Sequence, residues 1–291
     1  MNNIYCYKLL FDYLTNIFCR NGKPLPGNYV TADKTFSDKY IYHTQNGDIH
    51  DKKILKHFSG KYFFPETFFS REKFTSKEKE SIFFLKDSSN DNGDGLKLLS
   101  HENIPPIIPI NKIVQPVINS LLYNKRKFDI RVLVCVRRDG YIMIYKNLLY
   151  QINPNIFHDH KSNSTDVSLF ITNRQYHGDS SLSFFHKTHP GEFDTEHYLS
   201  QLKEIIPIIF DILLKIANVG YPESYENSFI FGGLDFLPKK IDNKLLFLEL
   251  NVTPGWGKAL GIDNYQEFYK LATDFILGKE KNLEECIYIS P

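Results

Sequence analysis

Two apolar segments near the C-terminal end of the chain carry acidic side chains, and they restrict the possible folds more than any other feature. Residues 230–237 and 245–250 predict two strands joined by the polar turn KKIDN. Asp235 lies at the end of the first strand, whereas Glu249 and Asn251 are two residues apart in the second. Because side chains alternate along a strand, Glu249 and Asn251 point to the same face. The segments therefore predict neighbouring strands that bring these three polar groups together.

Two carboxylates and one amide oxygen form an all-oxygen cluster, which suits hard Mg²⁺ ions held between protein and nucleotide phosphates. An acidic residue inside the apolar run LLFLELN is costly to bury unless it is paired or bound to a metal. The other interpretation is that Glu249 pairs with an arginine or lysine in the core. The residues alone leave both interpretations open.

A second chemical signal is a lysine between an apolar strand and a loop of small polar residues. Residues 81–86 predict a strand that ends at Lys86, and residues 87–95 are a turn of Asp, Ser, Asn and Gly. The backbone N–H groups of such a loop can approach phosphates, and the lysine adds a point charge. An ordinary turn is the alternative, because the spacing is not that of a P-loop.

The segment from Gln115 to Ile118 is predicted to be extended, in a form that can read an adenine ring. Pro116 has no N–H but keeps its carbonyl. That carbonyl can accept from the adenine amino group while the Ile118 N–H donates to the ring. A simple apolar connector is the alternative interpretation.

Alternation in residues 127–131 places three charged side chains on one face at the start of a strand. Lys127, Asp129 and Arg131 share this face, and the strand continues into an Asp-Gly hairpin over residues 131–145. The charged face is either a solvent-exposed edge or a site. In a site, Arg131 would be a fork for phosphate or carboxylate.

The remaining pattern predicts few helices. Apolar residues recur at helical spacing in residues 4–19 and 199–217, and Pro207 can kink or split the second helix. Tyr62–Phe64 before Pro65 predict a further strand.

Composition excludes several classes of protein. The 291 residues carry a net charge of +1, so no basic excess indicates a nucleic-acid or membrane partner. The four cysteines are far apart and form no CxxC pair, which argues against zinc or disulfide frameworks and for a reducing compartment. The N-terminal residues lack the basic region and apolar core of a signal peptide. We therefore expect a cytoplasmic protein.

Several of these segments follow one another in the order found in tubulin–tyrosine ligase-like enzymes. The string VQPVINSLLYNKRKFDIRVLVCV resembles the hinge and strand of that family, and IFFLKDSSNDNGDGL is similar to its strand, lysine and loop. LFITN resembles the family's H-L-T-N motif, and LDFLPKKIDNKLLFLELNVTPGWG its D-F…L-x-E-V-N end. DKKILKHFSGKYFFPETFF is a looser match. The resemblance runs from about residue 50 to residue 257.

The resemblance implies a role for each matching residue. Lys86 and Arg131 would be catalytic, with Lys86 on the α- and β-phosphates and Arg131 facing the transferred phosphoryl group and the substrate carboxylate. Mg²⁺ would be bound by Asp235, Glu249 and Asn251. The other ATP contacts would come from the loop, hinge, charged strand face and LFITN motif: Gly93, Asp94, Gly95, Gln115, Pro116, Val117, Ile118, Lys127, Asp129, Thr172 and Asn173.

The resemblance also implies an α+β fold of the ATP-grasp type, with ATP held between antiparallel sheets. We expect a short N-terminal subdomain at 1–56, a central subdomain with the phosphate loop at 57–118, and a C-terminal subdomain with the magnesium site at 119–291. The implied activity joins an amino acid to a carboxylate, on a peptide or protein, through an acylphosphate. The alternatives are a ligase for a small molecule or peptide natural product, and an inactive nucleotide-binding scaffold.

Two positions depart from the family pattern. Phe170 stands where the H-L-T-N motif has its histidine, and Tyr150 and Gln151 stand nearest to an arginine that helps to hold acidic substrates in the family. The resemblance therefore predicts a carboxylate substrate other than the tubulin C-terminus.

Overall fold

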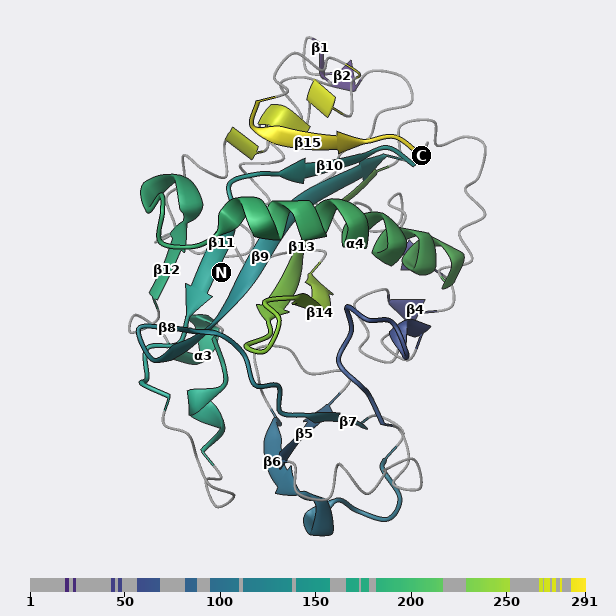
Figure 1. The fold of residues 1–291 in the computed structure, drawn as a ribbon. Helices are drawn as coiled ribbons and strands as arrows, with labels where there is room; N and C mark the ends of the chain where they lie inside the picture. The colour runs from purple at the N-terminus through teal and green to yellow at the C-terminus, as the bar shows by residue number, and fades with distance from the viewer. Residues whose placement is uncertain are drawn as a thin grey trace.

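The computed structural model describes a chain of mixed strands and helices, in residues 57–68, 82–87, 95–109, 112–137, 140–157, 166–172, 174–177, 182–216, 229–251 and 284–291 and in shorter pieces within 19–48 and 267–278. A large sheet of eight strands occupies the centre, and a smaller sheet of three strands lies apart from it, at the bottom of Figure 1. All the strand pairings in these residues are antiparallel.

The elements have the following bounds. The large sheet contains β8 (Leu122–Tyr123), β9 (Arg126–Arg137), β10 (Ile142–Tyr145), β11 (Leu149–Ile152), β12 (Leu182–Phe185), β13 (Phe229–Pro238), β14 (Leu245–Asn251) and β15 (Cys286–Ile289). The small sheet contains β5 (Ile82–Asp87), β6 (Lys97–Ser100) and β7 (Lys112–Pro116). Two short ladders are β1 (Cys19–Arg20) with β2 (Lys23–Pro24) and β3 (His43–Thr44) with β4 (Gly47–Asp48). The helices are α3 (Arg174–His177), α4 (Thr195–Ile216) and the 3-10 helices η4 (His101–Asn103), η5 (Val167–Leu169) and η7 (His186–Thr188).

Strand β9 is the central strand of the large sheet. It pairs on one edge with β11 and β10 and on the other edge with β13, which in turn pairs with β14. The predicted hairpin over 131–145 is confirmed as β9 and β10, and the two predicted C-terminal strands are confirmed as β13 and β14.

The pairing of β13 with β14 contains a register shift. Asp235 is opposite Glu249, but the next residue, Phe236, is opposite Phe247, so Leu248 is an extra residue in β14. A bulge of this kind reverses the side-chain alternation locally. As a result, Phe247 packs with Phe236 in the core while Glu249 lies beside Asp235.

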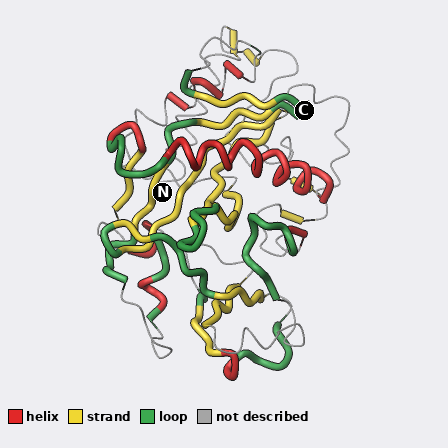
Figure 2. The backbone as a smooth tube through the Cα atoms, viewed as in Figure 1, coloured by secondary structure: helices red, strands yellow, loops and turns green. Residues whose placement is uncertain are grey.

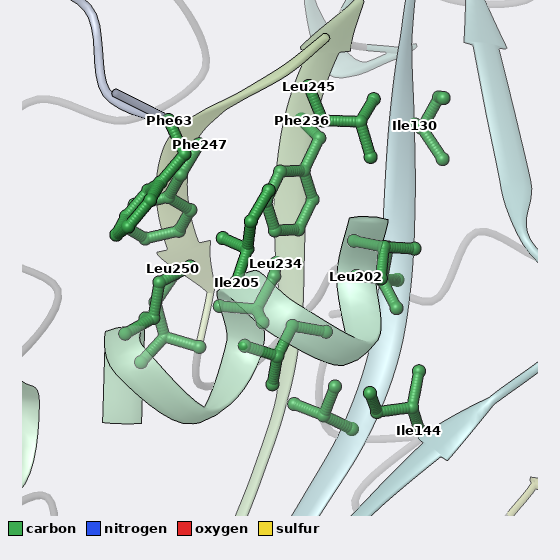
Figure 3. Packing of buried hydrophobic residues seen from close by; sticks show 14 of the residues in the cluster. Phe63, Ile130, Ile144, Leu202, Ile205, Leu234, Phe236, Leu245, Phe247 and Leu250 are labelled. Atoms are coloured by element: carbon green, nitrogen blue, oxygen red, sulfur yellow. The ribbon is translucent and has the colours of Figure 1, made fainter. Parts of the chain in front are cut away.

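The helix α4 lies across one face of the large sheet (Figure 2). Asp194 caps its N-terminus by accepting a hydrogen bond from the His197 N–H at 3.2 Å. Its buried apolar residues recur at helical spacing: Tyr198, Leu199, Leu202, Ile205, Ile206, Ile209, Phe210 and Leu213. Figure 3 shows Leu202 and Ile205 among strand residues such as Leu234. The predicted helix 199–217 is confirmed, and it continues unbroken through Pro207.

The large sheet has two different faces. Ile130, Val132 and Val134 of β9 point towards α4, whereas Leu133 and Cys135 pack on the opposite face against the helical residues between 267 and 275. Asp129 and Arg131 alternate with the core residues and therefore belong to this opposite face. That face is consequently apolar at one end and polar at the other.

The strand predicted at Tyr62–Phe64 is wrong, because these residues form turns. Phe63 and Phe64 are both buried, and Phe247 donates a main-chain hydrogen bond to the Phe63 carbonyl at 2.7 Å. Two consecutive buried rings do not fit the alternation of a strand. Residues 4–18 of the helix predicted at 4–19 lie outside the described residues, and its last residue, Cys19, belongs to strand β1 instead.

The small sheet has the order β6-β5-β7 and its own apolar cluster. Phe83 and Leu85 of β5 point into that cluster, whereas Phe84 and Lys86 lie on the other face. β5 confirms the strand predicted at 81–86. In the described residues, no helix is long and apolar enough to cross a membrane.

Candidate functional site

A row of polar side chains crosses the face of the large sheet that α4 does not cover. We call this set the polar row, and it consists of Gln151 on β11, Asp129 and Arg131 on β9, Asp235 on β13, and Glu249 and Asn251 on β14. Direct cross-strand pairing aligns them, because Gln151 is opposite Asp129, Arg131 is opposite Asp235, and Asp235 is opposite Glu249.

The centre of the polar row is a buried ion pair. Arg131 donates from Nε to Asp235 Oδ1 at 2.7 Å and from Nη2 to Asp235 Oδ2 at 2.8 Å. The two residues are 8% and 5% exposed, so their charges are largely removed from water. Two parallel charge-assisted bonds compensate for that cost.

Glu249 and Asn251 extend the polar row beyond the ion pair. The Asn251 amide nitrogen donates to Asp235 Oδ2 at 2.9 Å and to Glu249 Oε1 at 3.5 Å. The three predicted metal ligands are therefore in contact with one another. Arg131 forms its two charge-assisted bonds with Asp235. From the sequence, the alternative to metal binding was an ion pair of Glu249 with a core arginine or lysine.

The donor set of these three residues fits Mg²⁺. In the part of the chain that the structure describes, no group of three or more His, Cys, Asp or Glu side chains is placed to hold a metal ion. A cation at Asp235 and Glu249 would reach the amide oxygen of Asn251 only after that amide turns, because its nitrogen donates to both carboxylates. Two carboxylates and an amide oxygen are the hard ligands that Mg²⁺ accepts, with the remaining positions left to water and phosphate oxygens.

Asp129 lies beside the ion pair and is held by uncharged donors. Gln151 Nε2 donates to Asp129 Oδ1 at 2.9 Å, and the Thr172 hydroxyl donates to the other carboxylate oxygen. Burial, followed by the nearby Asp235 charge, raises the pKa of Asp129 to about 7, against the opposing effects of Thr172 and Arg131. Asp129 thus keeps its proton to a higher pH than an exposed carboxyl does.

The raised pKa of Asp129 predicts a pH dependence of stability. Its folded pKa of about 7 exceeds the unfolded value of 3.8, so the folded state holds the proton more tightly. The stability that this group contributes is complete below the unfolded pKa and is lost as pH rises towards 7, by up to about 1.4 kcal/mol per pH unit. Asp129→Asn should therefore lose less unfolding free energy than the wild type between pH 5 and pH 8 in urea denaturation.

The control for this measurement is Glu204→Gln on the exposed face of α4. It should show the same pH dependence as the wild type. Equal slopes for Asp129→Asn and the wild type would mean that the Asp129 proton is not linked to folding.

The structure separates the two residues that stand near the family's arginine position. Tyr150 points to the α4 side, where its hydroxyl is 2.8 Å from the Thr195 hydroxyl and its ring stacks on Phe193 at 3.9 Å between centroids. Gln151 points to the opposite side and belongs to the polar row. Of these two residues, only the neutral Gln151 lies at the site.

The small sheet carries the residues predicted to contact phosphates. Lys86 shares a face of β5 with Phe84, and its ammonium lies 5.5 Å from the centre of the Phe84 ring. The Phe84 ring meets that of Phe170 edge-on at 5.4 Å, so this face is turned towards the end of η5. Gly95 has a φ of +73°, a conformation that favours glycine.

Three of the predicted ATP contacts, Gly93, Asp94 and Asn173, lie outside the described residues.

The predicted adenine segment lies along the outer edge of β7. Val117 donates to the Ile82 carbonyl on β5 at 2.8 Å, and Val114 exchanges two main-chain bonds with Phe68 on the other edge, at 2.8 and 3.0 Å. Because main-chain groups alternate between the two edges of a strand, the Pro116 carbonyl faces the same side as Val114, and Ile118 lies two residues beyond the end of β7.

Gln115 has a structural contact. It is 3% exposed, and its side chain donates to the Thr67 hydroxyl at 2.8 Å.

A model of the tubulin-tyrosine ligase family matches residues 21–267. The chain belongs to this family. A search among curated proteins gave no match. Family membership confirms the α+β fold of the ATP-grasp type and makes the chain an ATP-dependent ligase.

The predicted site residues of this ligase fall into two groups. Asp129, Arg131, Thr172, Asp235, Glu249 and Asn251 meet on the large sheet. Lys86, Gly95 and the segment 115–118 belong to the small sheet and the connector that follows it. Sequence reasoning missed the contact between Gln151 and Asp129 and the rings around Lys127. No local pattern indicates either, because the partners are distant in the sequence.

Proposed function

We propose that this ligase joins an amino acid to a carboxylate on a peptide or protein, through an acylphosphate. A carboxylate oxygen would attack the γ-phosphorus of ATP, the bond to the β-phosphate would break, and ADP would leave. The amine would then attack the acyl carbon, lose a proton and expel phosphate. The observation that carries the proposal is the contact of Asp235 with both Arg131 and Asn251, in a chain of this family.

The residues divide the work by charge and position. Lys86 would lie on the α- and β-phosphates, because it shares the face of β5 whose Phe84 ring contacts Phe170 at the end of η5. Arg131, fixed by Asp235, would neutralise the transferred phosphoryl group and orient the attacking carboxylate. When bound at Asp235, Glu249 and Asn251, Mg²⁺ would supply charge neutralisation between the phosphates.

In this proposal, two of the expected subdomains hold ATP between them. Residues 57–118 contain the small sheet and residues 119–291 the large one, and ATP would lie between them. We also propose that residues 1–56 form a short N-terminal subdomain. We also propose a cytoplasmic location, since Cys135 and Cys286, whose side chains are described, are free buried thiols.

The direct test is ADP release with ATP and Mg²⁺ against a panel of amino acids and of small-molecule and peptide carboxylates. ADP release that requires both a carboxylate and an amine is the expected result. The absence of ADP release with every pair would favour an inactive scaffold.

The neutral Gln151 predicts that the tubulin C-terminus is not the substrate. Its amide nitrogen is bonded to Asp129, so this position lacks the cationic fork that binds an acidic tail. We expect no ligation of tyrosine, glutamate or glycine to tubulin. Gln151→Arg should increase ADP release with glutamate-rich peptides by about tenfold, since one charged hydrogen bond contributes roughly 1.5–3 kcal/mol.

The control is Gln151→Leu, which removes the amide without adding charge. It should give no increase with acidic peptides. Efficient tubulin ligation by the wild type would contradict the prediction.

A further inference from the structure

The ammonium group of Lys127 occupies a closely built internal site. The residue is 5% exposed. Its Nζ lies 3.3 Å from the Ile118 carbonyl oxygen and 3.2 Å from the Ser120 hydroxyl. The centres of the Phe157 and Phe170 rings are 4.3 and 5.1 Å away. Two oxygen acceptors and two aromatic faces offset the loss of water around this charge.

The carbonyl that Lys127 holds belongs to the predicted adenine segment. This connector is fixed before Ile118 by the bond from Val117 to Ile82 at 2.8 Å, and after it by the bond from Leu121 to the Pro238 carbonyl at 2.9 Å. Lys127 therefore acts on the peptide between the two fixed points. The Ile118 N–H belongs to the peptide bond just before this carbonyl, so its direction depends on the same stretch of backbone.

The two rings beside Lys127 are themselves held in place. Phe157 donates a main-chain bond to Lys125 at 2.7 Å. The segment before and after Phe170 is held by Asn153, whose amide nitrogen donates to the Ser168 and Ile171 carbonyls at 2.7 Å each. The ammonium site is therefore anchored on the large sheet through main-chain and buried amide contacts.

We propose that Lys127 is a positioning residue, which fixes the Ile118 peptide for recognition of the adenine ring of ATP. The inference rests on the proposed function, because it assumes that the edge of β7 reads adenine. It differs from a direct contact between Lys127 and the ribose or phosphates, because it assigns the ammonium to the Ile118 carbonyl, 3.3 Å away, rather than to the nucleotide. A positioning role affects the binding of ATP more than that of GTP, whereas a direct ribose or phosphate contact affects the binding of both nucleotides equally.

The test compares the binding of ATP and GTP to the full-length Lys127→Met variant by titration calorimetry, without turnover. Methionine keeps the length of the side chain and removes the charge. The Kd for ATP should rise by about tenfold, the effect of losing one charged hydrogen bond. The Kd for GTP should change little, because guanine presents a carbonyl where adenine presents its amino group. The preference for ATP over GTP should thus fall about tenfold.

A direct phosphate or ribose contact predicts a different result, in which both Kd values rise equally and the preference stays constant. That result would overturn the inference. Phe170→Leu, which removes an aromatic face but keeps apolar volume, should lower the preference in the same direction, and it replaces Lys127→Met if that variant does not fold. Lys127→Arg should restore most of the preference. If the wild type binds neither nucleotide, the proposed function fails together with the inference.

Discussion

Replacing Arg131 with methionine should lower the free energy of unfolding by about 3–5 kcal/mol, because a buried carboxylate is left without its partner. Arg131 holds both oxygens of Asp235 at 2.7 and 2.8 Å, and both residues are buried. Asp129 is also close enough for the charge of Asp235 to raise its pKa. Loss of the guanidinium would therefore leave several carboxylates close together. Urea denaturation followed by circular dichroism measures the effect.

Two further variants distinguish the effect of the Arg131–Asp235 ion pair on stability from its effect on ADP release. Arg131→Met combined with Asp235→Leu removes both charges and should regain much of the lost stability, because no charge is left buried alone. The double variant should still release no ADP. Lys239→Met, which breaks the exposed pair with Asp242 at 3.3 Å, is the surface control and should change stability far less. An unchanged unfolding midpoint for Arg131→Met alone would show that the ion pair does not stabilise the fold.

The sequence was sufficient to predict the strands that carry the polar row except β11, the strand of Gln151. The alternation of KFDIR identified the face shared by Asp129 and Arg131, and the spacing of Glu249 and Asn251 predicted their common side. These predictions succeeded because period two is a local property of an extended chain. The roles assigned to these residues stay predictions until they are tested by substitution.

The sequence could not predict which residues pair across the strands. The register that brings Arg131 to Asp235 joins positions 104 residues apart. The bulge at Leu248 also has no local signal, yet it sends Phe247 to the core and Glu249 to the site. Without the extra residue, both side chains would share one face. The bulge therefore decides whether β14 can serve the core and the polar row together.

Replacing Glu249 with glutamine should reduce ADP release by about a hundredfold to a thousandfold, because a neutral amide is a poor ligand for Mg²⁺ and leaves phosphate charge uncompensated. The fold should be retained. Glu249 is only partly buried, and its contact with Asn251 at 3.5 Å requires an acceptor oxygen, which glutamine also has. The measurement is steady-state ADP release over a range of Mg²⁺ concentrations, with thermal unfolding of the same samples.

Glu249→Asp is the matched control, because it keeps the carboxylate on a shorter side chain. It should retain part of the activity and require more Mg²⁺ for half-maximal rate, since the ligand is present but displaced. Glu204→Gln on the exposed face of α4 makes the same chemical change away from the polar row and should leave ADP release at the wild-type rate. Wild-type ADP release by Glu249→Gln would remove Glu249 from the metal site. Mg²⁺ would then have to bind without the Glu249 carboxylate. The remaining carboxylate, Asp235, already accepts hydrogen bonds from Arg131 on both oxygens.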